Sequence, residues 1–420
     1  MAHLLMIESW VGAMSSLLPR AIRETGHRFT FLTRDLHHYL RSAPGAGPHP
    51  LLAAENVLTA ETNDVPALLA YVERVHEVLR FDGVITSCDY YLSTVAEVAA
   101  HLGLPGPDPR AVERAYRKDF TRAALRDARV PGPRYELAEG WSATAKAASG
   151  LGYPLVVKPV DLCGGMHVRK VADETQLREA FLALEAFPVN ARSQPRVPSV
   201  LLEELLTGPE VSVETVTHDG VTHVVGVTDK SLAGEPWFVE SGHMFPADLD
   251  AADRDAAVAT AVAAIGALGL DNAVAHTEVK LTEDGPRLIE VNPRPAGNQI
   301  TELVRRVTGI DLPAVFAQLA VGERPALTPA ATGVRSAAIS FLLPPRAGLL
   351  AGIDGAEALG RESGVVDWAL KPSGHRAGDP TSNNTYLGHV VVTDVDGAGA
   401  RARAERAVAG LSVRYAEERA

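Results

Sequence analysis

The sequence feature that most constrains the fold is the stretch from 274 to 298, VAHTEVKLTEDGPRLIEVNPRPAGN. It predicts two short β-strands joined by a Glu-Asp-Gly turn, because Asp-Gly between runs of β-forming residues is a strong hairpin signal. Glu278 lies on the first predicted strand, and Glu290 and Asn292 share one face of the second, since side chains alternate along a strand. A hairpin can therefore bring two carboxylates and an amide oxygen together.

These three side chains offer hard oxygen ligands, which suit Mg²⁺ bridging nucleotide phosphates. The alternative is an exposed hairpin with ordinary polar residues on its wet face, and the hairpin alone does not decide between the two. Arg294, followed by Gly297 and Asn298, favours the metal site. A fork-shaped cation beside a metal can hold transferring phosphoryl oxygens.

Composition narrows the class of protein. At 420 residues, with 46% hydrophobic and 22% charged residues, the chain is typical of a soluble globular protein with two or three domains. The formal net charge of −12 argues against nucleic acid or an anionic membrane as the partner. Any anionic ligand must therefore be met by locally placed Lys and Arg side chains.

The cysteines and the N-terminus favour an ordinary cytoplasmic protein. Cys88 and Cys163 have no zinc-type spacing and form no disulfide framework. No basic region precedes an apolar run at the N-terminus, and no apolar run reaches the length needed to span a membrane. We expect the cytoplasm as the location and no membrane partner.

The first hundred residues alternate between strands and helices, which predicts a parallel sheet covered on both faces. Asp89 and Tyr90 follow a predicted strand, at the edge where open α/β sheets bind ligands, although caps and turns also occur there. The predicted strands lie at 3–8 and 27–32 and begin again at 81, and the predicted helices lie at 16–25 and 92–102.

A helix predicted at 110–126 carries Arg117, Lys118 and Arg122, charges that commonly mark a solvated face. Beyond it, a strand starting at 155 places Lys158 near its end. The Gly164-Gly165 turn that follows lets backbone N–H groups approach a phosphate closely, although a double glycine is usually only a turn.

The remaining segments give coarser predictions. Residues 187–198 have no clear period and predict a flexible surface loop, and residues 238–247 also predict a loop. The C-terminal 90 residues carry the weakest signal. Residues 200–214 predict a strand, a short connector and another strand; further strands are predicted at 222–228, 336–342 and 389–394, and helices at 253–268 and from 301 onward.

Taken in order, five features between residues 80 and 320 resemble the ATP-grasp superfamily of carboxylate–amine ligases. They are Lys118, Lys158 within VVKP, the Gly-Gly turn, the motif LEELLTGPE and the set Glu278, Glu290 and Asn292. The ordered set is far more specific than any one of its parts. The segments HTEVK and FVESGHMFPA are most similar to the L-amino acid ligase branch, whose members form dipeptides.

The resemblance implies a mixed α/β architecture, with an N-terminal parallel α/β domain followed by the two-part ATP-grasp fold. ATP would lie between two β-rich subdomains. The implied parts are an N-terminal domain at 1–108, an ATP-grasp core at 109–325 and a C-terminal α+β part at 326–420 that completes the catalytic domain. The core divides into a linker helix region at 109–145, a small lid subdomain at 146–210 and a catalytic subdomain at 211–325.

The resemblance also implies roles for individual residues. Glu203 would accept from the adenine amino group, with the backbone from Glu204 to Leu206 against the base, and Glu210 would accept from the ribose. The metal, Mg²⁺ or alternatively Mn²⁺, would be bound by Glu278, Glu290 and Asn292. The phosphates would be held by Lys118, Lys158, Gly164, Gly165 and Lys230, catalysis would use Arg294, His276 and Lys158, and the substrates would contact Glu240, His243, Gly297 and Asn298.

Two departures stand out. D-alanine–D-alanine ligase has an arginine two residues before its first metal carboxylate, whereas this chain has His276, which suggests that Arg294 carries the transition-state charge. The phosphate loop, Leu-Cys-Gly-Gly-Met, lacks the usual serine, so the donor that closes over the γ-phosphate is open.

The expected activity is ATP-dependent joining of a carboxylate, with amino acids as the expected substrates, to an amine through an acyl phosphate. The expected partners are small molecules, and a homodimer is left open. One rival is a bicarbonate-activating carboxylase of the biotin or carbamoyl type. Another is a non-catalytic, nucleotide-sensing protein, against which the complete metal set argues.

Overall fold

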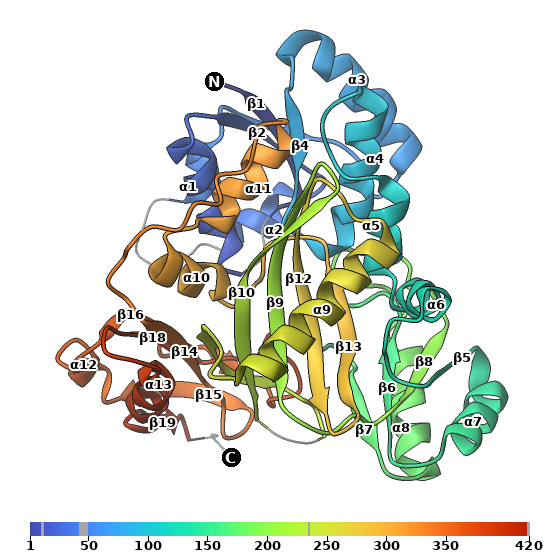
Figure 1. The fold of residues 1–420 in the computed structure, drawn as a ribbon, viewed down its shortest axis with the longest axis vertical. Coiled ribbons are helices and arrows are strands. Elements are labelled where there is room, and N and C mark those ends of the chain that lie inside the picture. The colour runs from blue at the N-terminus through green and yellow to red at the C-terminus, as the bar shows by residue number, and fades with distance from the viewer. Residues whose placement is uncertain (10–11, 42–48, 234–235, 418–420) are drawn as a thin grey trace.

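A computed structural model gives the structure of residues 1–9, 12–41, 49–233 and 236–417. Within these residues the chain forms four sheets with helices packed on them, a mixed α/β architecture (Figure 1). The N-terminal sheet is parallel throughout, in the order β3-β2-β1-β4, as the strand–helix alternation predicts. Its elements are β1 (His3–Ile7), α1 (Met14–Glu24), β2 (Arg28–Thr33), α2 (Leu36–Arg41), β3 (Asn56–Thr59), α3 (Val65–Leu79), β4 (Gly83–Ile85) and α4 (Leu92–Leu102).

A small antiparallel sheet follows, in the order β5-β8-β6-β7. Two helices pack on it and bury an apolar cluster that includes Leu155, Phe181 and Leu202. Its strands are β5 (Tyr135–Ala138), β6 (Leu155–Pro159), β7 (Arg169–Val171) and β8 (Val200–Glu204), and its helices are α7 (Gly140–Leu151) and α8 (Glu174–Glu185).

The large sheet contains eight strands in the order β13-β12-β9-β10-β11-β14-β18-β16. Neighbouring strands pair antiparallel, so β14, β16 and β18 of the C-terminal part complete the sheet that holds the central hairpin. The strands are β9 (Glu210–His218), β10 (Val221–Leu232), β11 (Glu240–Phe245), β12 (Ala273–Thr282), β13 (Gly285–Asn292), β14 (Ser336–Leu342), β16 (Val365–Leu370) and β18 (Gly388–Asp394).

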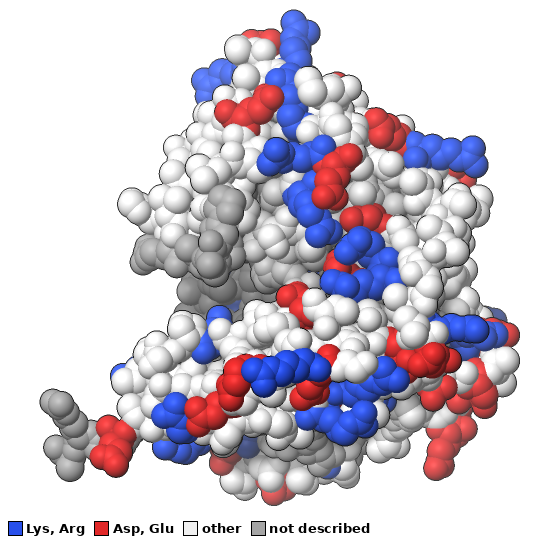
Figure 2. Space-filling model, turned by 90° about the vertical axis from the view of Figure 1, so that its left-hand side faces the viewer, with Lys and Arg blue, Asp and Glu red and all other residues white. Residues whose placement is uncertain are grey.

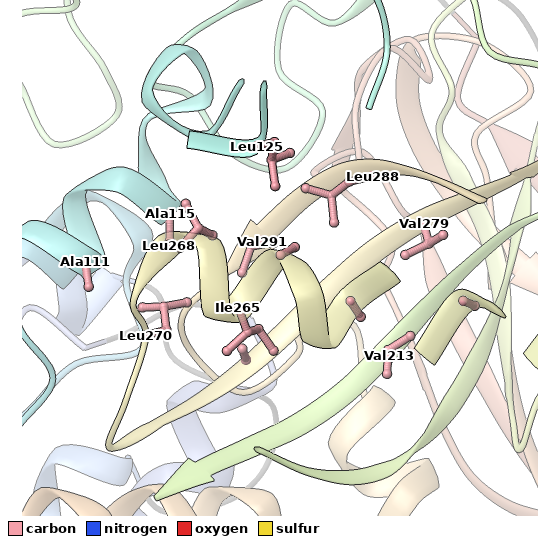
Figure 3. Packing of buried hydrophobic residues seen from close by; sticks show 14 of the residues in the cluster. Ala111, Ala115, Leu125, Val213, Ile265, Leu268, Leu270, Val279, Leu288 and Val291 are labelled. Carbon is pink, nitrogen blue, oxygen red and sulfur yellow. The ribbon is translucent and has the colours of Figure 1, made fainter. Parts of the chain in front are cut away.

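Helix α9 (Ala251–Leu268) lies along β9, β12 and β13 (Figure 1). Its start is capped by Asp250, which accepts a hydrogen bond from the Asp253 amide at 2.8 Å. Burying Ile265 and Leu268 against the sheet stabilises the fold by roughly 2 kcal/mol for each side chain. Figure 3 shows this core, with labelled side chains Val213, Ile265, Leu268, Val279, Leu288 and Val291.

The remaining elements link the parts. Helix α11 packs against α1 and β4, and its Ala317 and Ala320 join the core of the N-terminal sheet. A three-stranded sheet, β17-β15-β19, lies near the C-terminus. These elements are α10 (Ile300–Thr308), α11 (Leu312–Ala320), β15 (Gly348–Asp354), α12 (Ala356–Leu359), β17 (Arg376–Ala377), α13 (Ala400–Ala409) and β19 (Ser412–Tyr415).

Two sequence-based expectations differ from the structure. The helix predicted at 110–126 is broken into α5 (Pro109–Tyr116) and α6 (Lys118–Ala128), because Arg117 is extended and the Lys118 amide bonds the Val160 carbonyl at 3.0 Å. Residues 240–245 form β11 instead of a loop, paired to β10 and β14. The 187–198 loop is held by hydrogen bonds, for example from Asn63 Nδ2 to the Arg192 carbonyl at 2.9 Å.

The mixture of charges on the surface agrees with the composition of the chain, which contains 40 Lys and Arg and 52 Asp and Glu residues. Figure 2 shows Lys and Arg intermingled with Asp and Glu on the face that it presents. None of the helices among the described residues has the length and apolar character needed to cross a membrane.

Candidate active site

The hairpin of β12 and β13 places Glu278 directly opposite Glu290, and His276 opposite Asn292. The structure therefore confirms that these side chains meet, as the sequence predicts. Burial raises the pKa of Glu278 and the charge of Glu290 adds to this effect, but Lys230 and His276 together hold the pKa below its usual range. Two facing, ionised carboxylates are the result.

Each of these carboxylates has a cation beside it. Lys118 Nζ lies 3.2 Å from Glu290 Oε2, and Lys230 Nζ lies 2.6 Å from Glu278 Oε1. Burial raises the pKa of Glu290, but Lys118 and the hydrogen bond from the Asn292 amide together hold it well below its usual range.

These donors fit a hard divalent ion, since two charged carboxylates and an amide oxygen are the ligand types it prefers. The described residues contain no group of three or more His, Cys, Asp or Glu side chains arranged to hold a metal. A metal at the hairpin would therefore draw on the Asn292 amide and on ligand oxygens in addition to the two glutamates.

His276 lies between two carboxylates. Its Nδ1 is 3.0 and 3.1 Å from the two oxygens of Glu214, and its Nε2 is 3.2 Å from Glu278 Oε1. Burial lowers the pKa of His276, but Glu214 outweighs burial and raises it to about 9. His276 is therefore a cation at neutral pH, at the position where the resemblance leads one to expect an arginine.

Lys230 is the centre of a second cluster. Its Nζ contacts three carboxylates, Glu210 at 3.3 Å, Glu240 at 3.0 Å and Glu278 at 2.6 Å. The side chain is 1% exposed, and these neighbours outweigh burial and raise its pKa well above the usual value. Lys280 Nζ also contacts Glu210, at 3.1 Å.

At the proposed adenine end, both oxygens of Glu203 already have partners. Arg122 Nε donates to one and Lys158 Nζ lies beside the other, each at 2.6 Å. Lys158 thus pairs with Glu203, and its charge also lowers the pKa of Glu290. Arg122 is 2% exposed and also donates to the Ile289 carbonyl, so the solvated-face interpretation of this residue is wrong.

The neighbouring predicted nucleotide contacts occupy the edge of this region. Glu204 accepts hydrogen bonds from the backbone and the side chain of Arg134, at 2.8 and 2.7 Å. Leu206 lies in the connection between β8 and β9. Its backbone therefore takes no part in strand pairing, which is a condition for contact between that backbone and a base.

Arg294 is held by a residue from the N-terminal sheet. Its Nε and Nη2 donate to the two oxygens of Asp89 at 2.7 and 3.0 Å, and its Nη1 donates to the Pro295 carbonyl at 3.0 Å. A cavity of about 10 Å³ beside this pair has room for roughly one water-sized group. Its lining includes Asp89, Tyr116, Lys118, Cys163, Glu290 and Asn292.

The glycine turn has the backbone that the sequence predicts. Gly164 and Gly165 have φ of +65° and +71°, in the left-handed region that favours glycine. The Tyr90 hydroxyl contacts Met166 Sδ at 3.9 Å, and the Asn383 amide donates to the Gly164 carbonyl at 3.3 Å. The turn therefore touches both the N-terminal and the C-terminal parts.

Glu240, a predicted substrate residue, contacts Lys230, and His243 and Asn298 lie beside Glu240. Asn298 Nδ2 donates to Glu240, and Asn383 Oδ1 accepts from the Glu240 amide at 3.0 Å. His243 Nε2 is 3.2 Å from Glu240 Oε2, without hydrogen-bond geometry. Gly297 accepts the first hydrogen bond of α10.

Sequence reasoning missed several members of this arrangement. Glu214 lies opposite His276 on β9, and strand alternation in the motif EVSVE could have placed it inward. Asn383 carries no sequence signal, because it reaches the site from a connection between β17 and β18. Asp89 stands out only through its place after a predicted strand.

Three family models match the chain. An ATP-grasp domain matches residues 151–302, an ATP-grasp N-terminal domain matches 20–106, and an L-amino acid ligase C-terminal domain 2 matches 340–416.

Relatives support the same family. Uncharacterized protein y4rH of Sinorhizobium fredii is 30% identical over 396 residues, which cover 93% of this chain and 80% of that protein. Carnosine synthase 1 of Gallus gallus is 27% identical over 83% of this chain, and alanine–anticapsin ligase of Bacillus subtilis strain 168 is 26% identical over 57%. The matches cover only 39% and 54% of those two proteins.

Among solved structures, an L-amino acid ligase from Bacillus licheniformis superposes with a TM-score of 0.81 over 99% of both chains. At 24% identity this likeness concerns the fold. The matched domains, the y4rH relative and the fold agree, and the chain belongs to the ATP-grasp superfamily, among its ATP-dependent carbon–nitrogen ligases.

Proposed function

We propose that the protein joins the carboxylate of an amino acid to an amine, with ATP converted to ADP and phosphate. The observation that carries this proposal is the buried hairpin with Glu278 opposite Glu290, flanked by Lys118 and Lys230. Oxygen donors for a divalent ion and cations for phosphates converge there. Two curated relatives, named carnosine synthase and alanine–anticapsin ligase, support a ligase that uses amino acids.

The reaction proceeds in two displacements. A carboxylate oxygen of the acid attacks the γ-phosphorus, the bond from phosphorus to the β–γ bridging oxygen breaks, and ADP leaves with an acyl phosphate formed. The amine nitrogen then attacks the acyl carbon. The carbon–oxygen bond to phosphate breaks, inorganic phosphate leaves and the nitrogen loses a proton, which gives the amide.

The chain's residues act through position and charge. Lys118 and Lys230 lie beside the hairpin carboxylates and can exchange those partners for phosphate oxygens. His276 adds a fixed positive charge next to Glu278. Mg²⁺ or Mn²⁺, held by Glu278, Glu290 and Asn292, would neutralise and orient the phosphate oxygens.

The nucleotide would lie between the small sheet and the large sheet. Glu203 and Lys158 would face the adenine, and Glu210 the ribose. Because Arg122 already holds one oxygen of Glu203, the adenine amino group would share the carboxylate with Lys158. This places Lys158 nearer the base than the γ-phosphate and leaves Lys118 as the lysine next to the reacting phosphoryl group.

Water must be kept from the acyl phosphate, which it would hydrolyse. We assign this task to the turn at Gly164 and Gly165 together with the 187–198 loop. Gln194 of that loop donates to the Tyr90 carbonyl at 3.2 Å, so the loop bridges the small sheet and the N-terminal sheet.

We retain the domain boundaries 1–108, 109–325 and 326–420 as part of the proposal. Each matched family segment falls within one of these parts. Strands β14, β16 and β18 extend the hairpin's sheet, which supports a C-terminal part that completes the catalytic domain. A cytoplasmic location and a homodimer belong to the same proposal and are tested by cell fractionation and sedimentation.

The test is a phosphate-release screen over pairs of amino acids, with mass detection of any dipeptide. Phosphate that appears only with a pair, together with the mass of its amide, supports the proposal. ADP formation that depends on bicarbonate would favour a carboxylase instead. ATP binding without turnover for any pair or for bicarbonate would favour a nucleotide-binding protein.

A further inference from the structure

Asp89 and Arg294 form a buried pair across 205 positions of sequence. Asp89 lies in the single 3₁₀ turn after β4 and is 5% exposed, and Arg294 follows the hairpin. The contact is bidentate, with Nε and Nη2 each donating to a separate carboxylate oxygen. Such pairing orients the planar guanidinium as well as attracting it.

The hydrogen bonds of Arg294 leave a defined part of its guanidinium available. The group has five N–H donors in a fixed fork. Two donate to Asp89 and one to the Pro295 carbonyl. Among the hydrogen bonds of the described residues, one N–H group on Nη1 and one on Nη2 have no acceptor, and these two nitrogens form the end of the guanidinium fork.

The pair borders the site. Asp89 lines the same cavity of about 10 Å³ as Lys118, Glu290 and Asn292. A transferring phosphoryl group held by the hairpin and Lys118 therefore lies next to the Asp89–Arg294 pair. A guanidinium rotated out of this contact would no longer keep Nη1 and Nη2 in the same orientation.

Stability alone is a weak reason for such a pair. Removing two charges from water is costly, and hydrophobic replacements of buried ion pairs are often neutral or stabilising. The neighbouring residue adds a second link, because the Tyr90 hydroxyl contacts Met166 in the glycine turn and the Tyr90 carbonyl accepts from Gln194. One short segment thus touches Arg294 and both loops expected to close the site.

We infer that Asp89 is a positioning residue for the reaction: it holds the Arg294 guanidinium so that Nη1 and Nη2 face the transferring phosphoryl group. The N-terminal domain thereby supplies a group without which the catalytic arginine is misaligned. This inference rests on the proposed function for its kinetic consequence, but the geometry of the pair can be measured without turnover.

The first experiment observes Arg294 itself by ¹H–¹⁵N spectroscopy of arginine side chains in the full-length protein. The Nε–Hε signal of Arg294 is assigned as the one lost in Arg294→Lys. It is expected to be slow to exchange in the wild type and to shift or broaden in Asp89→Asn. The matched control is Asp82→Asn, which removes another carboxylate of the same sheet, one that accepts only from the His3 amide among the hydrogen bonds described.

The second experiment measures ligation by the same variants. Asp89→Asn is expected to lower kcat about 100-fold while changing the KM for ATP less than about three-fold, because small misplacements of a catalytic group cost about this much. Asp89→Glu, which keeps the charge, recovers part of the loss. Arg294→Lys and the double variant should be equally slow, since Asp89 acts only through Arg294.

The outcomes separate the inference from the proposed function. Losses that multiply in the double variant, or an Arg294 signal unchanged in Asp89→Asn, would overturn the positioning role. A rise confined to the KM for the acid or the amine, with Arg294 unchanged, would make Asp89 a substrate-binding residue instead. If the wild type ligates no pair of substrates, the proposed function fails, and the spectrum alone still decides the Asp89–Arg294 pair.

Discussion

Glu214 on β9 lies directly opposite His276 on β12, and both of its carboxylate oxygens approach His276 Nδ1, at 3.0 and 3.1 Å. The carboxylate is buried and also accepts from the hydroxyls of Ser212 and Thr228. A fully satisfied anion is thus fixed behind the imidazole. Glu278 of the hairpin consequently meets a cationic His276 at neutral pH.

This relationship predicts a pH dependence of stability in metal-free protein. The folded-state pKa of His276, about 9, lies above the ordinary value of 6.5, so its contribution is fully present below pH 6.5 and is lost as the pH rises through about 9. This rise in the pKa of His276 corresponds to a contribution on the order of 3 kcal/mol to the free energy of unfolding. The free energy of unfolding is measured in a chelator by denaturant titration. Glu214→Gln should be less stable than the wild type below pH 6.5, and the difference should shrink as the pH rises through about 9. A difference that stays constant would contradict the raised pKa, and the exposed Glu283→Gln is the control.

The metal assignment predicts that Glu290→Gln abolishes nearly all turnover without unfolding the protein. The change replaces a charged ligand by a neutral one of the same shape. Phosphate release and thermal unfolding are measured for this variant and for Glu283→Gln, which lies in the exposed turn of the same hairpin. Chelation should stop the wild type in the same way. Near-normal phosphate release by Glu290→Gln would remove the residue from the metal site.

The ribose assignment predicts that Glu210→Ala raises the KM for ATP about ten-fold or more. Losing a hydrogen bond to a charged group costs on the order of 1.5–3 kcal/mol, and about 1.4 kcal/mol corresponds to ten-fold. Steady-state kinetics with ATP and with 2′-deoxy-ATP provide the measurement. If the KM for ATP is unchanged, Glu210 does not contact the ribose.

The closing role of the 187–198 loop predicts uncoupling in Gln194→Ala. The variant loses the hydrogen bond to the Tyr90 carbonyl, so water should reach the acyl phosphate more often. The ratio of phosphate released to amide formed should then exceed one. Gln176→Ala alters a glutamine of the same subdomain that bonds only the nearby Ala172 amide among the hydrogen bonds described, and it should remain coupled.

The mechanism predicts where oxygen goes. With ¹⁸O-labelled acid, amine and ATP, one label should appear in inorganic phosphate, because the attacking carboxylate oxygen leaves with phosphorus. The other product should be ADP, and fast turnover should require the amine. AMP with pyrophosphate, or unlabelled phosphate alongside amide, would rule out this route whatever the fold.

Short-range patterns in the sequence determined the hairpin. Asp-Gly between β-forming runs sets a turn, and alternation puts Glu290 and Asn292 on one face, but Glu278 comes opposite Glu290 only because the register shifts at a β-bulge between Glu278 and Val279. The order of motifs was sufficient for the ATP-grasp superfamily. The parallel N-terminal sheet likewise follows from strands alternating with helices.

Local patterns failed where distant segments decide. Residues 240–245 become a strand because β10 and β14 offer their backbone edges, and Gly242 allows the approach, since a Cβ there would lie 2.6 Å from the Ile339 carbonyl. The break between α5 and α6 depends on the Val160 carbonyl. The sequence pattern suggests that Arg122 faces solvent, but the side chain is buried because it donates a hydrogen bond to Glu203, 81 positions away.

The roles of the site residues remain predictions, but their partners are a matter of tertiary structure. The sequence by itself determined which chemical groups the chain carries and, through strand and turn patterns, that a hairpin carries the two carboxylates, whereas the bulge that brings Glu278 opposite Glu290 belongs to the folded sheet. Only the tertiary structure decided that Lys158 pairs with Glu203, that Glu214 raises the pKa of His276 and that Asp89 accepts hydrogen bonds from Arg294. The physical reason is that ion pairs form between segments dozens to hundreds of residues apart, whose approach is set by sheet order and domain packing and leaves no periodic trace in sequence.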